Sequence, residues 1–122
     1  MTTSEIATVL AWHDALNEQD LDTLLALSSD DIEVGDATGA AQGHEALLDW
    51  ARSLDVKAEP GRMYVRDGVV VAEETITSVT GESGSAASAF RVVRDHVTSM
   101  FRHPDLAAAL AATDLSEKDL AG

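Results

Sequence analysis

Three charged side chains in this sequence could do chemistry together. Asp36 follows the short apolar alternation Ile32-Glu33-Val34 and precedes a glycine-containing loop. An aspartate desolvated there could act as a general base, because burial raises a carboxyl pKa towards neutrality. Arg91 and Arg102 could be its electrostatic partners, since an inward-facing arginine needs a carboxylate or an anionic ligand group. The alternatives are a solvated turn aspartate and two arginines at a sheet rim that pair with surface acids.

Aromatic, histidine and methionine side chains could complete such a site. His13, on the apolar stripe of an N-terminal helix, could shuttle protons, although a histidine at that place is more often structural. Aromatic and methionine residues at helical or strand spacing are likewise first of all core residues. The side chains expected to line a pocket are Trp12, His13, Trp50, Met63, Ala89 and Met100.

Metal and cofactor sites have little support in the sequence. The four histidines, at positions 13, 44, 96 and 103, lack a spacing that would place two ligands on one helix face. The chain contains no cysteine, which excludes thiolate ligands and thiolate nucleophiles. No nucleotide-binding glycine pattern is present. We therefore expect neither a metal nor a cofactor.

Composition limits the class of partner. The 122 residues fit one domain, residues 1–122, with room for a core and a modest pocket. The 22 acidic residues outnumber the 8 Lys and Arg, and a net charge of -14 repels nucleic acid and anionic membranes. We find no signal peptide and no apolar run near the ~20 residues of a membrane span. A cytoplasmic protein is expected.

Helical spacing dominates the first half of the chain. Apolar residues within 6–16 form one stripe, and Asp20 can cap a second helix that carries three leucines within 21–25. The linker between them is short, so the two helices should pack as a hairpin. A short strand at 32–34 and a loop at 35–43 come next. A third helix starts near His44 and ends before Glu59-Pro60-Gly61.

From residue 62 onward the pattern indicates antiparallel strands. Segments 63–66 and 69–72 flank Asp67-Gly68, a pair that suits a two-residue hairpin turn. Segments 87–93 and 96–102 flank Arg94-Asp95, and the four strands should form a meander. Pro104 indicates the first turn of a last helix across the sheet. The acidic tail after about residue 113 is expected to be frayed.

This order of elements resembles the nuclear transport factor two-like superfamily, specifically its SnoaL-like and ketosteroid-isomerase-like branch. The resemblance is carried by AWHDALNEQDLDTL at 11–24, DDIEVGD at 30–36 and GHEAL at 43–47. It implies an α+β fold, a cone-shaped curved antiparallel sheet wrapped around three N-terminal helices, as in cystatin-like and SnoaL-like proteins. The open end of the cone would hold an apolar pocket.

The resemblance also implies a small-molecule-binding function. In ketosteroid isomerases the base is an aspartate just after the first strand, which is the place of Asp36. Trp12 stands at the place of a first-helix tyrosine, and strand counting puts Ala89, whose side chain has no donor, at the place of an acid. We expect a small apolar ligand and an isomerase, hydrolase or cyclase-type reaction with an aspartate base. The alternative is a non-catalytic dimeric ligand-binding or interaction module.

Strand pairing across Arg94-Asp95 predicts which side chains face the pocket. A two-residue turn places Ala89 opposite Met100 and puts Arg91 and Arg102 on their face. By the resemblance, that face points into the pocket, although a slip of one residue would swap every assignment. The opposite face, with Phe90, Val92, Val97 and Phe101, would then be an exposed apolar surface. Such surfaces rarely stay uncovered, so we predict a homodimer formed sheet to sheet.

Overall fold

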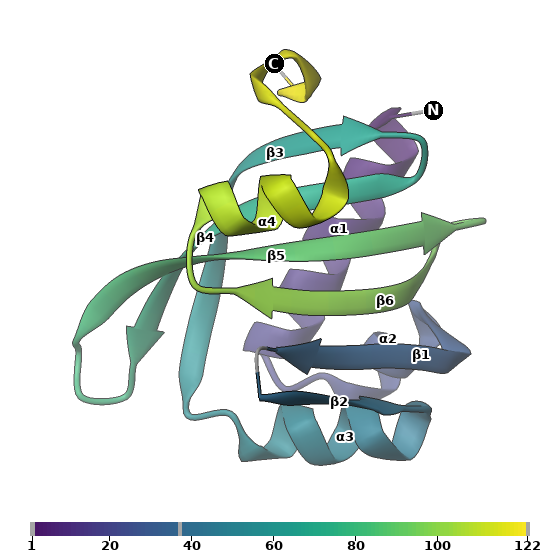
Figure 1. Ribbon diagram of the computed structural model, residues 1–122. Coiled ribbons are helices and arrows are strands. Elements are labelled where there is room, and N and C mark those ends of the chain that lie inside the picture. The colour runs from purple at the N-terminus through teal and green to yellow at the C-terminus, as the bar shows by residue number, and fades with distance from the viewer. Residues whose placement is uncertain (1, 37, 122) are drawn as a thin grey trace.

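The computed structural model describes residues 2–36 and 38–121 and shows a curved, unclosed sheet between helices (Figure 1). The helices are α1 (Thr2–Asn17), α2 (Leu21–Ala26), α3 (His44–Ser53), α4 (Leu106–Thr113) and the 3-10 helix η1 (Glu117–Asp119). The strands are β1 (Ser28–Asp36), β2 (Gly39–Gln42), β3 (Val56–Arg66), β4 (Val69–Ser78), β5 (Ser83–Val93) and β6 (His96–His103). The predicted α+β fold is confirmed. No helix in these ranges has both the length and the apolar character needed to cross a membrane.

The sheet has six strands in the order β2-β1-β6-β5-β4-β3. The strands β3 to β6 form the predicted antiparallel meander. The strand β1 lies parallel to β6, and β2, which falls in a segment expected to be a loop, pairs antiparallel with β1. The last strand of the meander, β6, therefore lies beside the first strand of the chain, β1.

Local sequence explains most of the element boundaries. The Asp20 side chain accepts a hydrogen bond from the Thr23 amide and caps α2, as predicted. The residues of the Asp67-Gly68 turn have φ angles of 52° and 83°, which suit the twist of a hairpin. Pro104 does not lie in the first turn of α4. It precedes the N-cap residue Asp105, whose carboxylate accepts from the Ala108 amide at 2.8 Å.

The register of the last hairpin differs from the prediction. The pairs next to the turn, Val93 with His96 and Val92 with Val97, are as expected. An extra residue, Thr98, then forms a bulge in β6, so that Ala89 pairs with Phe101, and Phe90 pairs with Met100. The predicted pair of Ala89 and Met100 is wrong because a bulge shifts every later residue by one position.

The shifted register moves side chains between the two faces of the sheet. The inner face, which packs against α1, α2 and α3, carries Phe90, Val92, Val97 and Met100. The outer face, partly covered by α4, carries Ala87 and Ala89 with Tyr64 and Val71. The predicted exposed surface of Phe90, Val92 and Val97 is therefore wrong, because these side chains are buried in the core.

The C-terminal residues, for which the sequence predicted fraying, lie along β3. Leu120 forms a β-bridge with Tyr64, and the Ala121 amide donates to the Met63 carbonyl oxygen at 2.8 Å. The Leu115 side chain is buried against Ala109 of α4 and Tyr64. Helix α4 thus covers part of the outer face, and the end of the chain lies along the edge of β3 (Figure 1).

Candidate functional site

A chain of polar contacts crosses the buried interior between α1 and β4. His13 Nε2 lies 2.6 Å from Glu74 Oε2, and each side chain is only 1% exposed. His13 Nδ1 lies 2.9 Å from the Val9 carbonyl oxygen, which can only accept, so this nitrogen carries a hydrogen. The other ring nitrogen and the Glu74 carboxyl group are joined by a hydrogen bond. The pair joins the first helix to the centre of the sheet.

The second oxygen of Glu74 faces two further side chains. Ser88 Oγ donates to Glu74 Oε1 at 2.8 Å, and Arg102 Nε lies 3.6 Å from the same oxygen. The Arg102 guanidinium carbon lies 5.7 Å from the ring centroid of Trp50, within the range of a cation-π contact. Arg102 is 21% exposed, so it connects the buried carboxylate with the surface.

Sequence reasoning missed Glu74 and Ser88. The available signal was the alternation of β4, in which Val70 and Ala72 are inner residues and Glu74 follows two positions later. An acid at that place needs buried partners, and the chain supplies them from β5 and α1. The partners themselves could not be found without the register of β5.

Most of the predicted pocket-lining residues belong to the core. Trp12, His13, Met63 and Met100 are buried, and Trp12 stacks on half-buried Trp50 with 6.1 Å between ring centroids. The Trp12 indole nitrogen donates to Ser28 Oγ at 3.0 Å. A ligand could contact the four buried side chains only by displacing others. The sixth residue, Ala89, lies on the other face of the sheet.

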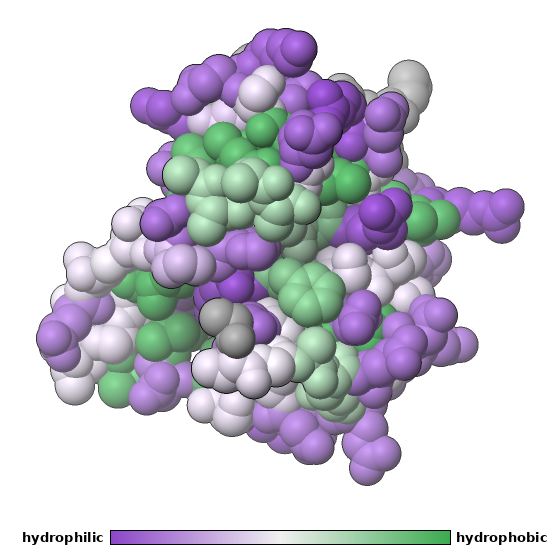
Figure 2. Space-filling model, in the orientation of Figure 1, coloured by the Kyte–Doolittle hydropathy of each residue, from purple (hydrophilic) through white to green (hydrophobic). Residues whose placement is uncertain are grey.

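A cavity of about 420 Å³ lies on the outer face beside α4, and we call it the outer-face cavity. Its floor contains Val69, Ala89, Ser99 and Phe101, and its α4 wall contains Ala112 and Thr113. The remaining lining residues are Asp36, Phe90, Arg91, Arg102, His103 and Pro104. Figure 2 shows this face, on which apolar and hydrophilic side chains lie close together below α4.

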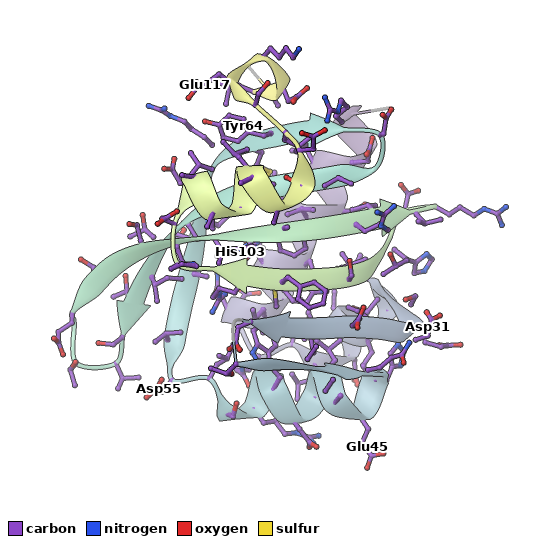
Figure 3. The ribbon with its side chains drawn as sticks, in the orientation of Figure 1. Asp31, Glu45, Asp55, Tyr64, His103 and Glu117 are labelled. Atoms are coloured by element: carbon purple, nitrogen blue, oxygen red, sulfur yellow. The ribbon has the colours of Figure 1, made fainter. Side chains whose placement is uncertain are left out.

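Asp36, Arg91 and Arg102, the three predicted catalytic residues, all line the outer-face cavity. They reach it from different places. Arg91 projects from the outer face of β5, whereas Arg102 also contacts the buried Glu74. Asp36 ends β1, and His103, labelled in Figure 3, ends β6. Part of the predicted site is thus brought together, but outside the cone and not inside it.

Asp36 does not have the environment that the general-base hypothesis required. Its carboxylate is exposed, and Oδ1 accepts hydrogen bonds from Thr38 Oγ1 at 2.6 Å and from the Thr38 amide at 2.8 Å. The Thr38 hydroxyl and amide bonds hold the pKa of Asp36 below its ordinary value of 3.8, outweighing a small opposing effect of burial. The residue is therefore ionised at neutral pH and is a weak base.

Within residues 2–36 and 38–121, no three His, Asp or Glu side chains come together in a way that could hold an ion. His13 and Glu74 supply only two such groups, and their other polar atoms contact Val9 and Ser88.

Comparisons with known structures give the fold. No curated protein matches the chain in sequence. An NTF2-like protein of unknown function from Cytophaga hutchinsonii has 17% identity and a TM-score of 0.74 over 83% of this chain and 89% of its own. A proposed ketosteroid isomerase from Kribbella flavida has 16% identity and a TM-score of 0.76 over 85% and 80%. TerC, crystallised with polyporic acid, has 16% identity and a TM-score of 0.71 over 92% and 97%.

The sequence itself gives the family. The SnoaL-like domain matches residues 9–105, which reach from the first helix through the last strand. The match includes the polar groups His13, Glu74, Ser88 and Arg102, and it ends just before α4. The chain belongs to the SnoaL-like family, and its fold is that of the NTF2-like structure from Cytophaga hutchinsonii.

Proposed function

We propose that this chain binds a small, mostly apolar molecule in the outer-face cavity. The observation that carries the proposal is the cavity itself, because about 420 Å³ lies within the 300–1,000 Å³ range of small-molecule sites. Its apolar floor, with a few charged groups at the edges, is the lining that such sites usually have. Asp36 and Arg102 lie at one end and Arg91 lies on the wall.

Packing elsewhere supports the choice of this cavity. The interior of the cone is occupied by Trp12, Phe90 and Met100, each almost fully buried. Phe90 lies edge-on to Trp12 with 5.4 Å between ring centroids, so these rings fill the space that an internal ligand would need. The TerC structure contains polyporic acid, which supports ligand binding by this fold, although at 16% identity only the fold is shared.

Catalysis of the isomerase, hydrolase or cyclase type is the second candidate. It is favoured by Asp36 and Arg102 lining one cavity, where a carboxylate and a guanidinium could act on opposite ends of a substrate. The lowered pKa of Asp36 disfavours it, because an ionised exposed carboxylate accepts a proton poorly. For any ligand that is turned over, Asp36→Asn should slow the reaction, and unchanged kinetics would remove Asp36 as the base.

A cavity-filling variant tests the binding proposal. Ala111 and Ala112 are both exposed residues of α4, and only Ala112 lines the cavity. Apolar fragments found by NMR should shift the amides of Ala89 and Ser99. Ala112→Phe should weaken their binding about tenfold, whereas Ala111→Phe should change it less than about twofold. Fragment shifts confined to Trp12 and Met100, or full affinity in Ala112→Phe, would contradict the proposal.

A further inference from the structure

We infer that the ligand of the outer-face cavity is a monocarboxylate with a compact apolar body, and that Arg91 with Ser99 holds its carboxylate. This inference rests on the proposed function, because it names the chemical class of ligand for the same cavity. Arg91 and Ser99 are directly paired across β5 and β6, and both line the cavity. A guanidinium and a hydroxyl therefore project side by side from the sheet into the cavity.

No described carboxylate balances the charge on Arg91. Within residues 2–36 and 38–121, no carboxylate forms an ion pair with Arg91, although the sequence contains 22 acidic residues. Other exposed basic residues of the chain, such as Arg94, are also unpaired in those ranges. Arg91 differs from Arg94 in its place, since only Arg91 lines a cavity with an apolar floor. A ligand anion there would be partly removed from water, which strengthens its contact with the guanidinium.

Arg102 does not compete for the same role. Its Nε lies 3.6 Å from Glu74 Oε1, and its charge also acts on Asp36, where it helps to lower the carboxyl pKa. Glu74 therefore already forms an ion pair with Arg102, and Asp36 adds a weaker attraction. That end of the cavity presents Asp36 as well, which would repel a second negative charge on the ligand. The arrangement selects one negative charge at the Arg91 end.

The floor between the two ends fits an apolar body. Ala89 and Phe101 are paired on neighbouring strands, and Val69 lies beside Arg91 on β4. The Phe101 ring sits over Gly35 of β1, where an added Cβ would come within 2.9 Å of the ring. The absence of a side chain at Gly35 therefore leaves room for the Phe101 ring at the cavity floor. A chain or ring system attached to the carboxylate would cover Ala89 and Phe101.

Matched acids and amides test the inference. Benzoate, 2-naphthoate and decanoate are each compared at neutral pH with the corresponding primary amide, by calorimetry and NMR on the full chain. The best acid should bind about tenfold or more tightly than its amide, because a charged hydrogen bond is stronger than a neutral one. Arg91→Gln should reduce this ratio to below about threefold, and Ser99→Ala should weaken only the acid, by about threefold.

Controls distinguish a failure of the monocarboxylate inference from a failure of the proposed ligand-binding function. Arg94→Gln removes an exposed arginine of the same hairpin and should leave the acid preference unchanged. Equal affinity of acid and amide, with amide shifts at Ala89 and Ser99, would overturn the monocarboxylate inference and leave the proposed function standing. An acid preference that survives Arg91→Gln would also overturn it. Failure of every acid and amide to bind would overturn the proposed function together with the inference.

Discussion

Thr38, two residues after Asp36, determines the ionisation state of the Asp36 carboxylate. Thr38 offers both a hydroxyl and an amide to Oδ1, and hydrogen bonds to the charged form favour that form. The position of Asp36 after β1 was predictable from the apolar alternation before it. Its chemistry was not, because the turn that follows β1 brings in Thr38 and leaves the carboxylate in water.

Titration of Asp36 checks this reading. The pKa measured by carboxyl NMR should lie below 3.8, and Thr38→Ala should raise it, since the Thr38 hydroxyl is the largest cause of the shift. A pKa that is lower in the folded than in the unfolded chain stabilises the fold above the unfolded value, and this contribution disappears as pH falls through the folded pKa. Thr80→Ala, which removes an exposed hydroxyl bonded to Glu82, should leave Asp36 unchanged. Titration of Asp36 above 3.8 would contradict the assignment.

Glu74 and His13 are also residues whose role depends on the side chains that they contact. Each is buried, and each has its partner 61 positions away in the sequence. Removing one member of a buried charged pair leaves the other without compensation, which costs far more than the net worth of the pair. The arrangement therefore holds α1 at one place on β4.

A substitution series measures this constraint. Glu74→Gln should lower the free energy of unfolding in urea by about 3 kcal/mol, because His13 and Arg102 lose their shared carboxylate. Glu73→Gln, one position along the strand and facing away, should cost less than about 1 kcal/mol. The double variant His13→Leu with Glu74→Leu should lose less than the sum of its single variants. Wild-type stability of Glu74→Gln would show that the pair is not structural.

At the scale of elements, the sequence predicts those helices, caps and turns that depend on neighbouring residues alone. Helical stripes, the Asp20 cap and the Asp67-Gly68 turn could all be predicted, and they are present. The face assignment failed at Thr98, because a bulge has no reliable local signal when an alternating strand contains only one extra residue. That single residue decides whether Met100 and Arg102 or their neighbours face the core. Met100 and Arg102 face inward as expected, whereas Ala89 lies on the outer face.

The turn of the last hairpin is strained, and this gives a prediction. Arg94 and Asp95 have φ angles of 51° and 64°, in the left-handed region that costs ordinary L residues about 1–2 kcal/mol each. The double change Arg94→Asn and Asp95→Gly should raise the free energy of unfolding by about 1 kcal/mol, because Asn-Gly suits this turn. Asp67→Asn, in a turn that already has Gly68, should have almost no effect. A loss of stability in the Asn-Gly variant would show that the turn is not of this type.

At the scale of the whole molecule, the sheet is covered on both faces but unequally. The first three helices cover the inner face, while α4 covers only part of the outer one (Figure 1). Most of the apolar surface from which a homodimer was predicted is in fact core. Phe101 remains on the outer face, and alternation along β5 places Val93, which is 48% exposed, on the same side. Because Phe101 and Val93 remain as apolar side chains on the outer face, the homodimer stays a proposal.

Charge and exposure together define the test of that dimer. Two copies of a chain with a net charge of -14 repel each other, so association should strengthen as salt screens the repulsion. Sedimentation equilibrium at micromolar concentration should give a mass approaching twice 12.9 kDa at high salt. Val93→Asp should return the chain to a monomer, because it places a charge in the apolar contact. Val79→Asp, at a loop residue that is 81% exposed, should not. A strictly monomeric wild-type chain at every salt concentration would refute the dimer. In that case no second copy of the chain would cover the outer-face cavity in solution.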